Sequence, residues 1–246
     1  FVIRGFMLPE FFLEKIKKIN PNIKMIMSQW DAERENPYFH LINSFDKIYS
    51  FDYEDCKQNQ KLIHRPLFFS KDIEKFKQDN QKIIYDYFFM GAYIPERYNA
   101  ILKFKKIIKD RNLSAKLYVY IPFTTYVKEK IKGKKLDMEI LSTTPLDRNT
   151  YLKLLSSSKV MVDVSNENQT GLAMRVIEAV GAEKKILTSN KFIINEKFYN
   201  ESTVQLFSLK DFSLDESFLK SKKVNEVNVN YYSLKNWVKE HFLDLD

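Results

Sequence analysis

Short apolar runs alternate along the chain with longer stretches in which apolar residues recur every three or four positions. The runs have the length of buried strands and occupy residues 23–27, 47–51, 83–90, 116–121, 160–162 and 185–188. The stretches between them have helical spacing, as in residues 9–20, where Phe12, Ile16 and Ile19 form one stripe. This alternation predicts parallel sheets and an α/β fold class.

The most informative stretch covers residues 163–190. A polar loop over residues 165–170 follows a buried run, and a helical pattern comes next, with Leu172, Val176, Ala179 and Val180 on one side. Gly181 is placed to end this helix, and a second strand follows over residues 185–188. The pattern predicts a strand-loop-helix-strand unit.

Polar residues mark the start of that helix. Gly171, Arg175 and Glu178 share a face, because residues three and four apart are neighbours on a helix. A helix start carries unpaired N–H groups and the positive end of the dipole, which suits a phosphate. The spacing by itself indicates only that a cation and a carboxylate lie on one polar face.

The same residues resemble a known family. Gln169-Thr170-Gly171-Leu172, Met174-Arg175 and Ile177-Glu178-Ala179 look like the donor-site segment of bacterial GT-B glycosyltransferases of capsule and lipopolysaccharide assembly. The resemblance departs at Glu183, where many relatives have glycine. It implies a GT-B-like fold, with two Rossmann-like domains facing a cleft.

The resemblance also implies roles for single residues. Arg175 would reach the diphosphate of the donor, and Glu178 would bind the nucleotide ribose. Gln169, Thr170 and Gly171 would contribute further donor contacts. Because Arg175 would stabilise the leaving diphosphate, we expect catalysis without a metal ion or other cofactor. No Asp-x-Asp pair occurs in this segment, and we assign no metal ligand.

A weaker match covers Phe89 to Arg97. The sequence predicts that Gly91 directly follows a strand and precedes a helix, where glycine permits close approach of the backbone to a ligand. An ordinary tight turn is the alternative. The match adds Gly91 and Arg97 as candidates for contacts to the donor phosphate or the acceptor.

Asp31 is the candidate catalytic residue of the first half. It follows a predicted strand with Trp30, at the edge where open α/β sheets place their ligands. Asp31 could hold an acceptor hydroxyl or act as a general base, or it could cap a turn. His64 is interpreted as a structural or interface histidine.

The expected domains are residues 1–70, a partial acceptor-side domain, and residues 71–225, the donor domain. Residues 226–246 would form a final helix that packs back on the first domain, with Trp237 as its anchor. Because the chain opens directly on a strand, we expect the first domain to be incomplete at its N-terminus.

Composition indicates which cellular compartment and which partners to expect. The chain has 246 residues, a formal charge of +8 and one cysteine, Cys56, which fits a reducing compartment. No apolar run approaches the roughly 20 residues that span a bilayer. We therefore expect a cytoplasmic protein, weakly attracted to the anionic inner face of a membrane. No nucleic-acid motif is visible, and nucleic acid is not an expected partner.

These observations lead to one main hypothesis and two alternatives. The main one is a glycosyltransferase that moves a sugar from a nucleotide-diphosphate sugar to a cell-surface glycan or lipid-linked acceptor. The first alternative is another GT-B enzyme, such as a nucleotide-sugar epimerase. The second is a non-catalytic module that binds a nucleotide or another polyanion. Transfer or hydrolysis of a donor separates an enzyme from a binding module.

Overall fold

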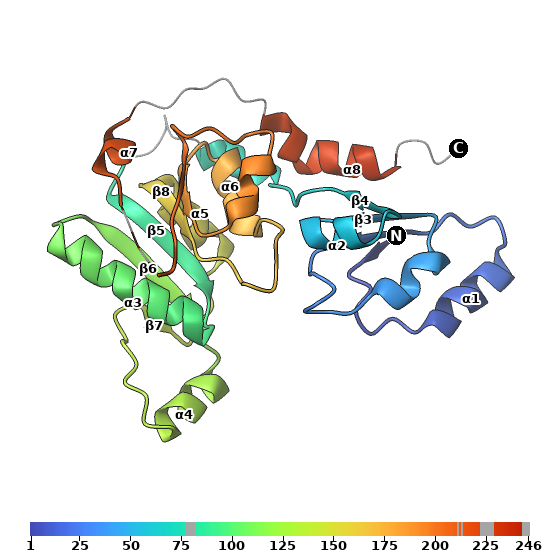
Figure 1. Ribbon diagram of the computed structural model, residues 1–246, viewed down its shortest axis with the longest axis horizontal. Coiled ribbons are helices and arrows are strands. Elements are labelled where there is room, and N and C mark those ends of the chain that lie inside the picture. Colours follow the sequence, from blue (N-terminus) through green and yellow to red (C-terminus); the bar gives the residue numbers. More distant parts are fainter. Residues whose placement is uncertain (77–81, 211, 213, 222–228, 243–246) are drawn as a thin grey trace. The chain divides into compact units, whose positions relative to one another are not determined.

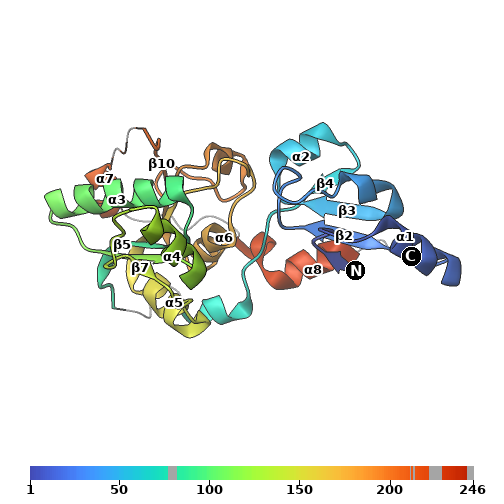
Figure 2. The ribbon, with the colours of Figure 1, turned by 90° about the horizontal axis from the view of Figure 1, so that it is seen from below.

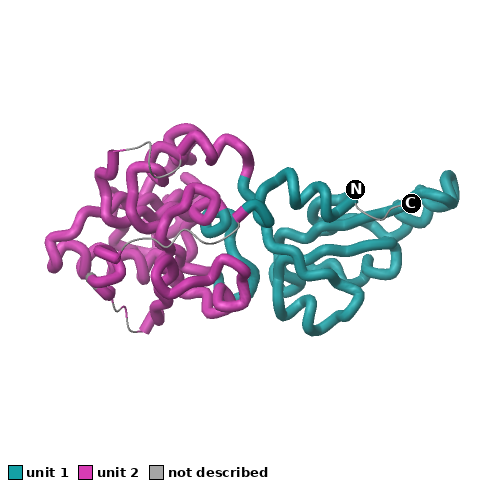
Figure 3. Tube along the Cα trace, turned by 90° about the horizontal axis from the view of Figure 1, so that it is seen from above, with its two compact units in different colours: residues 1–69, 166–177, 230–246 teal, residues 70–165, 178–229 magenta. Residues whose placement is uncertain are grey.

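The computed structural model describes residues 1–76, 82–210, 212, 214–221 and 229–242. The chain divides into two compact units, and each is described by itself (Figure 3). Unit 1 comprises Phe1–Phe69, Asn166–Ile177 and Asn230–Asp246, and unit 2 comprises Ser70–Ser165 and Glu178–Val229. The expected domain boundary near residue 70 stays a prediction, and the one at residues 225–226 lies outside the described residues.

Unit 1 is built on a parallel sheet of four strands, in the order β1-β2-β3-β4. The strands are β1 (Val2–Ile3), β2 (Ile26–Gln29), β3 (Lys47–Ser50) and β4 (Leu62–His64). Its helices are α1 (Glu10–Ile19), α2 (Tyr53–Gln58) and α8 (Leu234–Phe242), with 3-10 helices η1 (Phe39–Ser44) and η5 (Val229–Tyr232) beside them. The core is formed by apolar side chains from α1, η1 and the strands, including Leu13, Met27, Leu41 and Ile48.

Helix α1 forms where the spacing predicts it, but it buries a different face. Leu13 is 2% exposed, whereas Phe12 is 49% and Ile19 is 76% exposed, so the predicted stripe is wrong. Leu13 and Ile16 are three residues apart and also share a face, and both pack against the core of unit 1. Two overlapping stripes fit the same spacing, and tertiary packing selects the one that carries Leu13.

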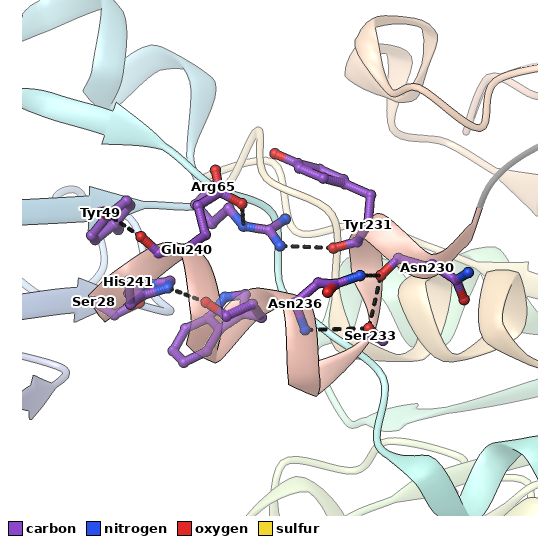
Figure 4. A network of polar contacts seen from close by, with 10 residues as sticks. Ser28, Tyr49, Arg65, Asn230, Tyr231, Ser233, Asn236, Glu240 and His241 are labelled. Carbon is purple, nitrogen blue, oxygen red and sulfur yellow. Dashed lines mark hydrogen bonds and ion pairs between the residues drawn. The ribbon is translucent and has the colours of Figure 1, made fainter. Parts of the chain in front are cut away.

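The last helix, α8, packs against the sheet of unit 1 through its aromatic and histidine side chains. Trp237 is 3% exposed and His241 is fully buried. The His241 ring lies 4.0 Å from the Tyr49 ring, measured between centroids. Its Nδ1 donates to the Trp237 carbonyl at 2.7 Å, and Nε2 lies 3.2 Å from Ser28 Oγ, whose hydroxyl donates to it in the neutral tautomer (Figure 4).

A buried arginine adds a second attachment for α8. Arg65 is 2% exposed, and its Nε lies 2.7 Å from a carboxylate oxygen of Glu240. Arg65 Nη2 donates to the Tyr231 carbonyl at 2.7 Å, and the guanidinium lies 3.9 Å from the centroid of the Tyr231 ring. Figure 4 shows these contacts converging on Arg65 from the segment that leads into α8 and from α8 itself. Ionic, hydrogen-bond and cation-π interactions therefore hold α8 in place.

We expect unit 1 to lose stability in mild acid because of His241. Burial lowers the pKa of His241 to about 4, opposed by its bond to the Trp237 carbonyl and assisted by Arg65. The unfolded chain takes up this proton near pH 6.5 and the folded chain only near pH 4, so stability is lost as pH falls through that window. Between pH 7 and 5 the free energy of unfolding should fall by about 2 kcal/mol.

Chemical denaturation at both pH values measures this loss. His241→Asn should reduce the pH dependence and leave the part due to His64, whose pKa burial also lowers, whereas His40→Gln, at an exposed histidine, should leave it intact. An unchanged pH dependence in His241→Asn would contradict the assignment.

Unit 2 contains a six-stranded parallel sheet in the order β10-β9-β8-β5-β6-β7. The strands are β5 (Tyr85–Ala92), β6 (Ala115–Tyr120), β7 (Leu141–Ser142), β8 (Ser158–Asp163), β9 (Lys185–Thr188) and β10 (Val204–Leu206). The helices are η2 (Lys71–Phe76), α3 (Pro95–Asp110), α4 (Phe123–Ile131), α5 (Arg148–Ser156), α6 (Met174–Gly181), η4 (Lys191–Asn195) and α7 (Glu216–Lys220). Helix α6 begins in the segment assigned to unit 1. Figures 1 and 2 show α3 and α5 on opposite faces of this sheet.

The strand order of unit 2 is that of a doubly wound Rossmann sheet. Numbered from β5 as strand 1, the order is 3-2-1-4-5-6. β5 pairs with β6 on one side and with β8 on the other, so the chain reverses direction across the sheet between β5 and β8. Sheets of this kind bind ligands outside the carboxyl ends of the strands at such a switch point.

The turn after α6 keeps a glycine-like conformation although a glutamate occupies it. Glu183, at the departure from the resembled family, has a φ of 56°. The Lys184 N–H donates to the Ala179 carbonyl at 2.8 Å, which closes the helix end. Glu183 therefore adopts the left-handed conformation that ends the helix, at the cost of backbone strain.

Glu183→Gly should relieve this strain. We expect the free energy of unfolding to rise by about 0.5–1 kcal/mol, since a left-handed residue is unfavourable for all but glycine. Glu183→Ala keeps the Cβ and should give no such gain. Equal stabilities of the two variants in chemical denaturation would contradict the explanation.

None of the helices in the described ranges is both long and apolar enough to cross a membrane.

Candidate functional site

Arg97 occupies the switch point of the sheet in unit 2. It lies in the first turn of α3 and is 8% exposed. Its Nε donates to the Val164 carbonyl at 2.9 Å and its Nη1 donates to the Ala92 carbonyl at 3.1 Å. Arg97 thus joins the chain leaving β8 to the end of β5, and these two guanidinium donors are engaged by the protein backbone. Its position fixes the shape of the edge where ligands bind in such sheets.

Gly91 lies inside β5, so the expectation that it directly follows the strand is wrong. Its register partner is Val119 of β6. A Cβ at this position would lie 3.0 Å from Cζ of Phe89 and 3.6 Å from Cδ of Arg97. The glycine therefore makes room for side chains of unit 2. Strand β5 continues two residues beyond Met90, because β6 supplies backbone partners for Gly91 and Ala92.

The ends of β8 and β9 are tied together by hydroxyl groups. The Thr188 hydroxyl donates to Asp163 Oδ2 at 2.7 Å, and both residues are buried. The Ser165 N–H donates to Ser189 Oγ at 3.0 Å, and the two serine hydroxyl groups are also 3.0 Å apart. This network fixes the chain at Ser165, just after β8.

Glu178, the predicted ribose ligand, is buried on α6 and paired with an arginine. Its side chain is 8% exposed and contacts Arg148 Nη1 in an ion pair. The same guanidinium donates from Nε to Asp72 Oδ2 at 2.9 Å and from Nη2 to the Ser70 hydroxyl at 3.2 Å. Arg148 therefore holds the carboxylate of α6 and the segment around η2 in one network within unit 2.

Burial dominates the electrostatics of Glu178. Desolvation raises the pKa of Glu178 above its usual range, although hydrogen bonds from Tyr151 and Arg148 oppose this shift. For Arg148, burial disfavours the charge, but the bonds to Asp72 and Glu178 outweigh it and raise its pKa. The bond to Arg148 also lowers the pKa of Asp72. Glu178 is thus a carboxylate whose charge is costly without a donor beside it.

Arg175 is the second residue of α6 and is half-buried. It precedes Glu178 by three residues on the same helix, as the sequence predicts. Gly171 differs, because α6 begins only at Met174 and Gly171 lies in the loop before it. The expectation that Gly171 shares a helical face with Arg175 and Glu178 is therefore wrong. The loop is held by contacts that the helical periodicity does not describe.

A buried aspartate of unit 1 holds that loop. Asp52 has no solvent exposure and caps α2, where its Oδ1 accepts from the Glu54 and Asp55 N–H groups at 3.0 and 3.1 Å. Its Oδ2 accepts from the Thr170 N–H at 2.7 Å and from the Gly171 N–H at 3.3 Å. Both segments belong to unit 1. One carboxylate therefore satisfies four backbone donors from two parts of the chain.

The loop also packs closely against the end of β3. A Cβ on Gly171 would lie 2.5 Å from the Phe51 carbonyl oxygen and 2.4 Å from its ring. The Thr170 hydroxyl accepts from the Glu54 N–H at 3.1 Å. Gln169 lies one residue earlier, where its N–H donates to the Asn166 carbonyl at 3.1 Å. Gly171 is thus needed for contact with Phe51, and Thr170 bonds to the start of α2.

Asp31 lies just beyond β2 in unit 1. Its Oδ2 is 3.2 Å from Arg4 Nε, and its side chain is 17% exposed. The strand ends beside it align three polar residues, because Gln29, Ser50 and His64 are register partners across β2, β3 and β4. Burial lowers the pKa of His64, whose ring stacks on Tyr53 at 4.1 Å. The carboxyl edge of the first sheet therefore carries Asp31 and a row of hydrogen-bonding groups.

Sequence reasoning missed Asp52, Arg148 and Tyr151. The sequence signal for Asp52 is its place directly before a predicted helix, where aspartate caps well, but capping alone does not point to the loop at Thr170. Nothing in the spacing links Arg148 with Glu178, thirty positions away. Both pairings arise only when the chain folds.

Among the described residues, no three His, Cys, Asp or Glu side chains are grouped closely enough to hold a metal ion. One Asp-x-Asp pair does occur in the chain, at Asp244 and Asp246, and it lies outside the described residues.

Comparisons with known proteins identify the fold. No family model matches the chain, and no curated protein matches its sequence. The structure is similar to that of an alpha-glucosyltransferase solved in complex with UDP and a 13-mer DNA containing a central A:G mismatch. That match has a TM-score of 0.58 and 15% identity, and covers 94% of this chain and 68% of the other.

A UDP-GlcNAc 2-epimerase from Methanocaldococcus jannaschii is also similar, with a TM-score of 0.45, 13% identity, and coverage of 97% of this chain and 75% of the other. The glucosyltransferase match and the two parallel sheets confirm the predicted α/β, GT-B-like fold class with two Rossmann-like sheets. At this level of identity the likeness shows the fold alone.

Proposed function

We propose that this chain is a glycosyltransferase that transfers a sugar from a nucleotide-diphosphate sugar to a glycan or lipid-linked acceptor, without a metal ion. The supporting observation is the β8-loop-α6 unit, in which Arg175 stands in the first turn of α6 and Glu178 follows one turn later. The fold adds support, because a structurally similar glucosyltransferase was solved with UDP bound.

Arg175 is proposed to bind the diphosphate. A guanidinium can donate two parallel hydrogen bonds to phosphate oxygens, and the N-terminal turn of a helix adds the positive end of its dipole. Negative charge grows on the diphosphate as the bond to the sugar breaks. A fixed cation there stabilises the transition state more than the bound substrate and so accelerates transfer.

Glu178 is proposed to accept hydrogen bonds from the ribose hydroxyl groups. Arg148 already holds one oxygen of this carboxylate, which fixes its rotamer and offsets the cost of burying its charge. A carboxylate offers about four acceptor positions, so the pairing leaves capacity for a ribose. Gln169, Thr170 and Gly171 are proposed to shape the loop before α6, and Gly91 and Arg97 the switch point of unit 2.

Asp31 is proposed as the acceptor-side residue. It lies at the carboxyl edge of the first sheet, where its ion pair with Arg4 orients the carboxylate. In this role it would hold an acceptor hydroxyl or remove its proton during transfer. Asp31→Asn should slow transfer while leaving nucleotide affinity unchanged.

Calorimetric titration with UDP, GDP, CDP and ADP in the presence of a chelator tests the donor site. The best of the four should bind without metal. Arg175→Ala should weaken binding about tenfold and also slow turnover, because a charge-assisted bond to phosphate is lost in both states. Glu178→Gln should weaken binding by a similar factor with less effect on turnover at saturating donor.

Arg34→Ala, at an exposed arginine of unit 1, is the charge-matched control and should bind as the unaltered protein does. Unchanged affinity in both Arg175→Ala and Glu178→Gln would remove the assignment and leave a structural ion pair at Glu178. Binding that survives without any transfer or hydrolysis of a matching nucleotide sugar would favour the non-catalytic binding module.

A further inference from the structure

Helix α4 of unit 2 turns its apolar side chains outward. Phe123 is 66% exposed, Val127 is 37% exposed and Ile131 is 81% exposed. Successive members of this set are four residues apart, so the three side chains form a stripe along one side of α4. Figure 1 shows α4 standing away from the rest of unit 2. The stripe is thus presented to the surroundings of the protein.

The inner side of α4 carries a buried glutamate and the half-buried Tyr126, which packs against the core of unit 2. Glu129 is the buried residue of this helix. Its carboxylate forms ion pairs with Lys132, at 3.0 Å, and with Lys134. It also accepts from the Tyr93 hydroxyl at 3.0 Å. Helical spacing places Glu129 almost opposite the stripe and Tyr126 to one side of it, so the packing of α4 within unit 2 leaves the three stripe residues exposed.

Lysines surround the stripe. Residues 122–135 contain five lysines and one glutamate, and that glutamate is the buried Glu129. Lys128 and Lys130 are exposed on the two flanks of the stripe, and Lys135 is exposed just beyond the helix. Hydrogen bonds from Lys134 and Lys132 lower the pKa of Glu129 to about 2. Glu129 is therefore ionised at neutral pH. With five lysines against one glutamate, the segment remains strongly basic.

We propose that α4 is a docking element for an anionic lipid surface. In this arrangement Phe123, Val127 and Ile131 enter the boundary between headgroups and acyl chains, while the flanking lysines contact lipid phosphates. A helix with an apolar stripe and a lysine-rich border binds membranes by burial of apolar area together with attraction to anionic lipids. The proposal places this contact on the donor-side unit and does not depend on the reaction that the protein catalyses.

Charge favours α4 over α1, another helix with exposed apolar side chains. Phe11 and Ile19 of α1 are 70% and 76% exposed, so apolar exposure is similar in the two helices. In α1, however, two glutamates accompany three lysines, and both glutamates are exposed. Acidic side chains at the surface would oppose an anionic bilayer. The two helices therefore form a matched pair for an experiment.

Vesicle sedimentation with the whole chain tests the proposal. We expect binding to vesicles of phosphatidylcholine with about one third phosphatidylglycerol, weaker binding to phosphatidylcholine alone, and a decline as salt rises. Phe123→Ser with Ile131→Ser should weaken binding to the anionic vesicles about tenfold. Lys128→Gln with Lys130→Gln should weaken it by a similar factor and reduce its salt dependence.

Two control pairs match these changes. Phe11→Ser with Ile19→Ser removes as much exposed apolar area from α1, and Lys103→Gln with Lys106→Gln removes the same charge from exposed positions of α3. Both should bind as the unaltered protein does. Equal losses of vesicle binding in the control pairs and the α4 pairs would overturn the proposal. Loss of vesicle binding in the α1 pair alone would also overturn it. Unchanged vesicle binding with reduced self-association in the α4 pair would assign the surface to a second copy instead.

Discussion

Replacing Asp52 with alanine is expected to lower the free energy of unfolding by about 3–5 kcal/mol. The carboxylate is fully buried and accepts from four backbone N–H groups, those of Glu54, Asp55, Thr170 and Gly171. Alanine removes this shared acceptor, although the Glu54 N–H keeps its second acceptor, the Thr170 hydroxyl. Each buried donor left without a partner costs about 1–3 kcal/mol. The loss should exceed that of an ordinary helix cap, since two segments are released together.

Asp147→Ala provides the comparison. Asp147 caps α5 by accepting from the Thr150 N–H at 3.0 Å, but it is exposed and serves one segment only. Its removal should cost about 1 kcal/mol, the usual value for a cap. Chemical denaturation measures both variants. A cost for Asp52→Ala no larger than that for Asp147→Ala would show that the bonds to Thr170 and Gly171 contribute little.

Asp52→Asn refines the test. Asparagine keeps one oxygen for the cap of α2 but brings an NH₂ group toward donors that need an acceptor. If the loop before α6 positions Arg175, this variant should weaken nucleotide binding while α2 stays capped. A variant that loses stability but binds nucleotides normally would limit Asp52 to a structural role.

The strands and most helices could be predicted because their signals are local. Strand β9 coincides with the apolar run over residues 185–188, and α6 ends at Gly181 as predicted. The final helix likewise forms over Leu234–Phe242, close to its amphipathic pattern. Periodicity reports which residues could share a face. It does not report which of two overlapping faces is buried, and α1 shows the consequence.

The contacts that define the candidate site could not be predicted in this way. The Asp52 bond to Thr170 joins residues 118 positions apart, and the bond between Arg148 and Glu178 joins residues 30 apart. Each depends on the fold to bring together groups whose local sequence contexts are independent. Gly91 shows a related limit, because β6 extends the pairing of β5 beyond the end that its own composition suggests.

Gly171→Ala is expected to lower the free energy of unfolding by about 3 kcal/mol, because the new Cβ meets backbone that has no room to move. It would lie 2.5 Å from the Phe51 carbonyl oxygen, closer than such atoms pack in folded proteins. Phe51 follows β3 directly and is itself buried, so relief requires the loop before α6 to move. That movement should also reduce nucleotide affinity, since Arg175 follows four residues later.

Two other glycines make this a graded test. A Cβ on Gly5 would lie 2.6 Å from the Met27 sulfur, a flexible side-chain atom that can shift, and one on Gly91 would lie 3.0 Å from the Phe89 ring. Both alanine variants should therefore cost less than Gly171→Ala, by about 1 kcal/mol or more. Denaturation ranks the three variants, and UDP titration of the folded Gly171→Ala protein measures the second effect. A stable Gly171→Ala variant with normal affinity would show that the loop adapts freely, and that contact with Phe51 does not determine where α6 begins.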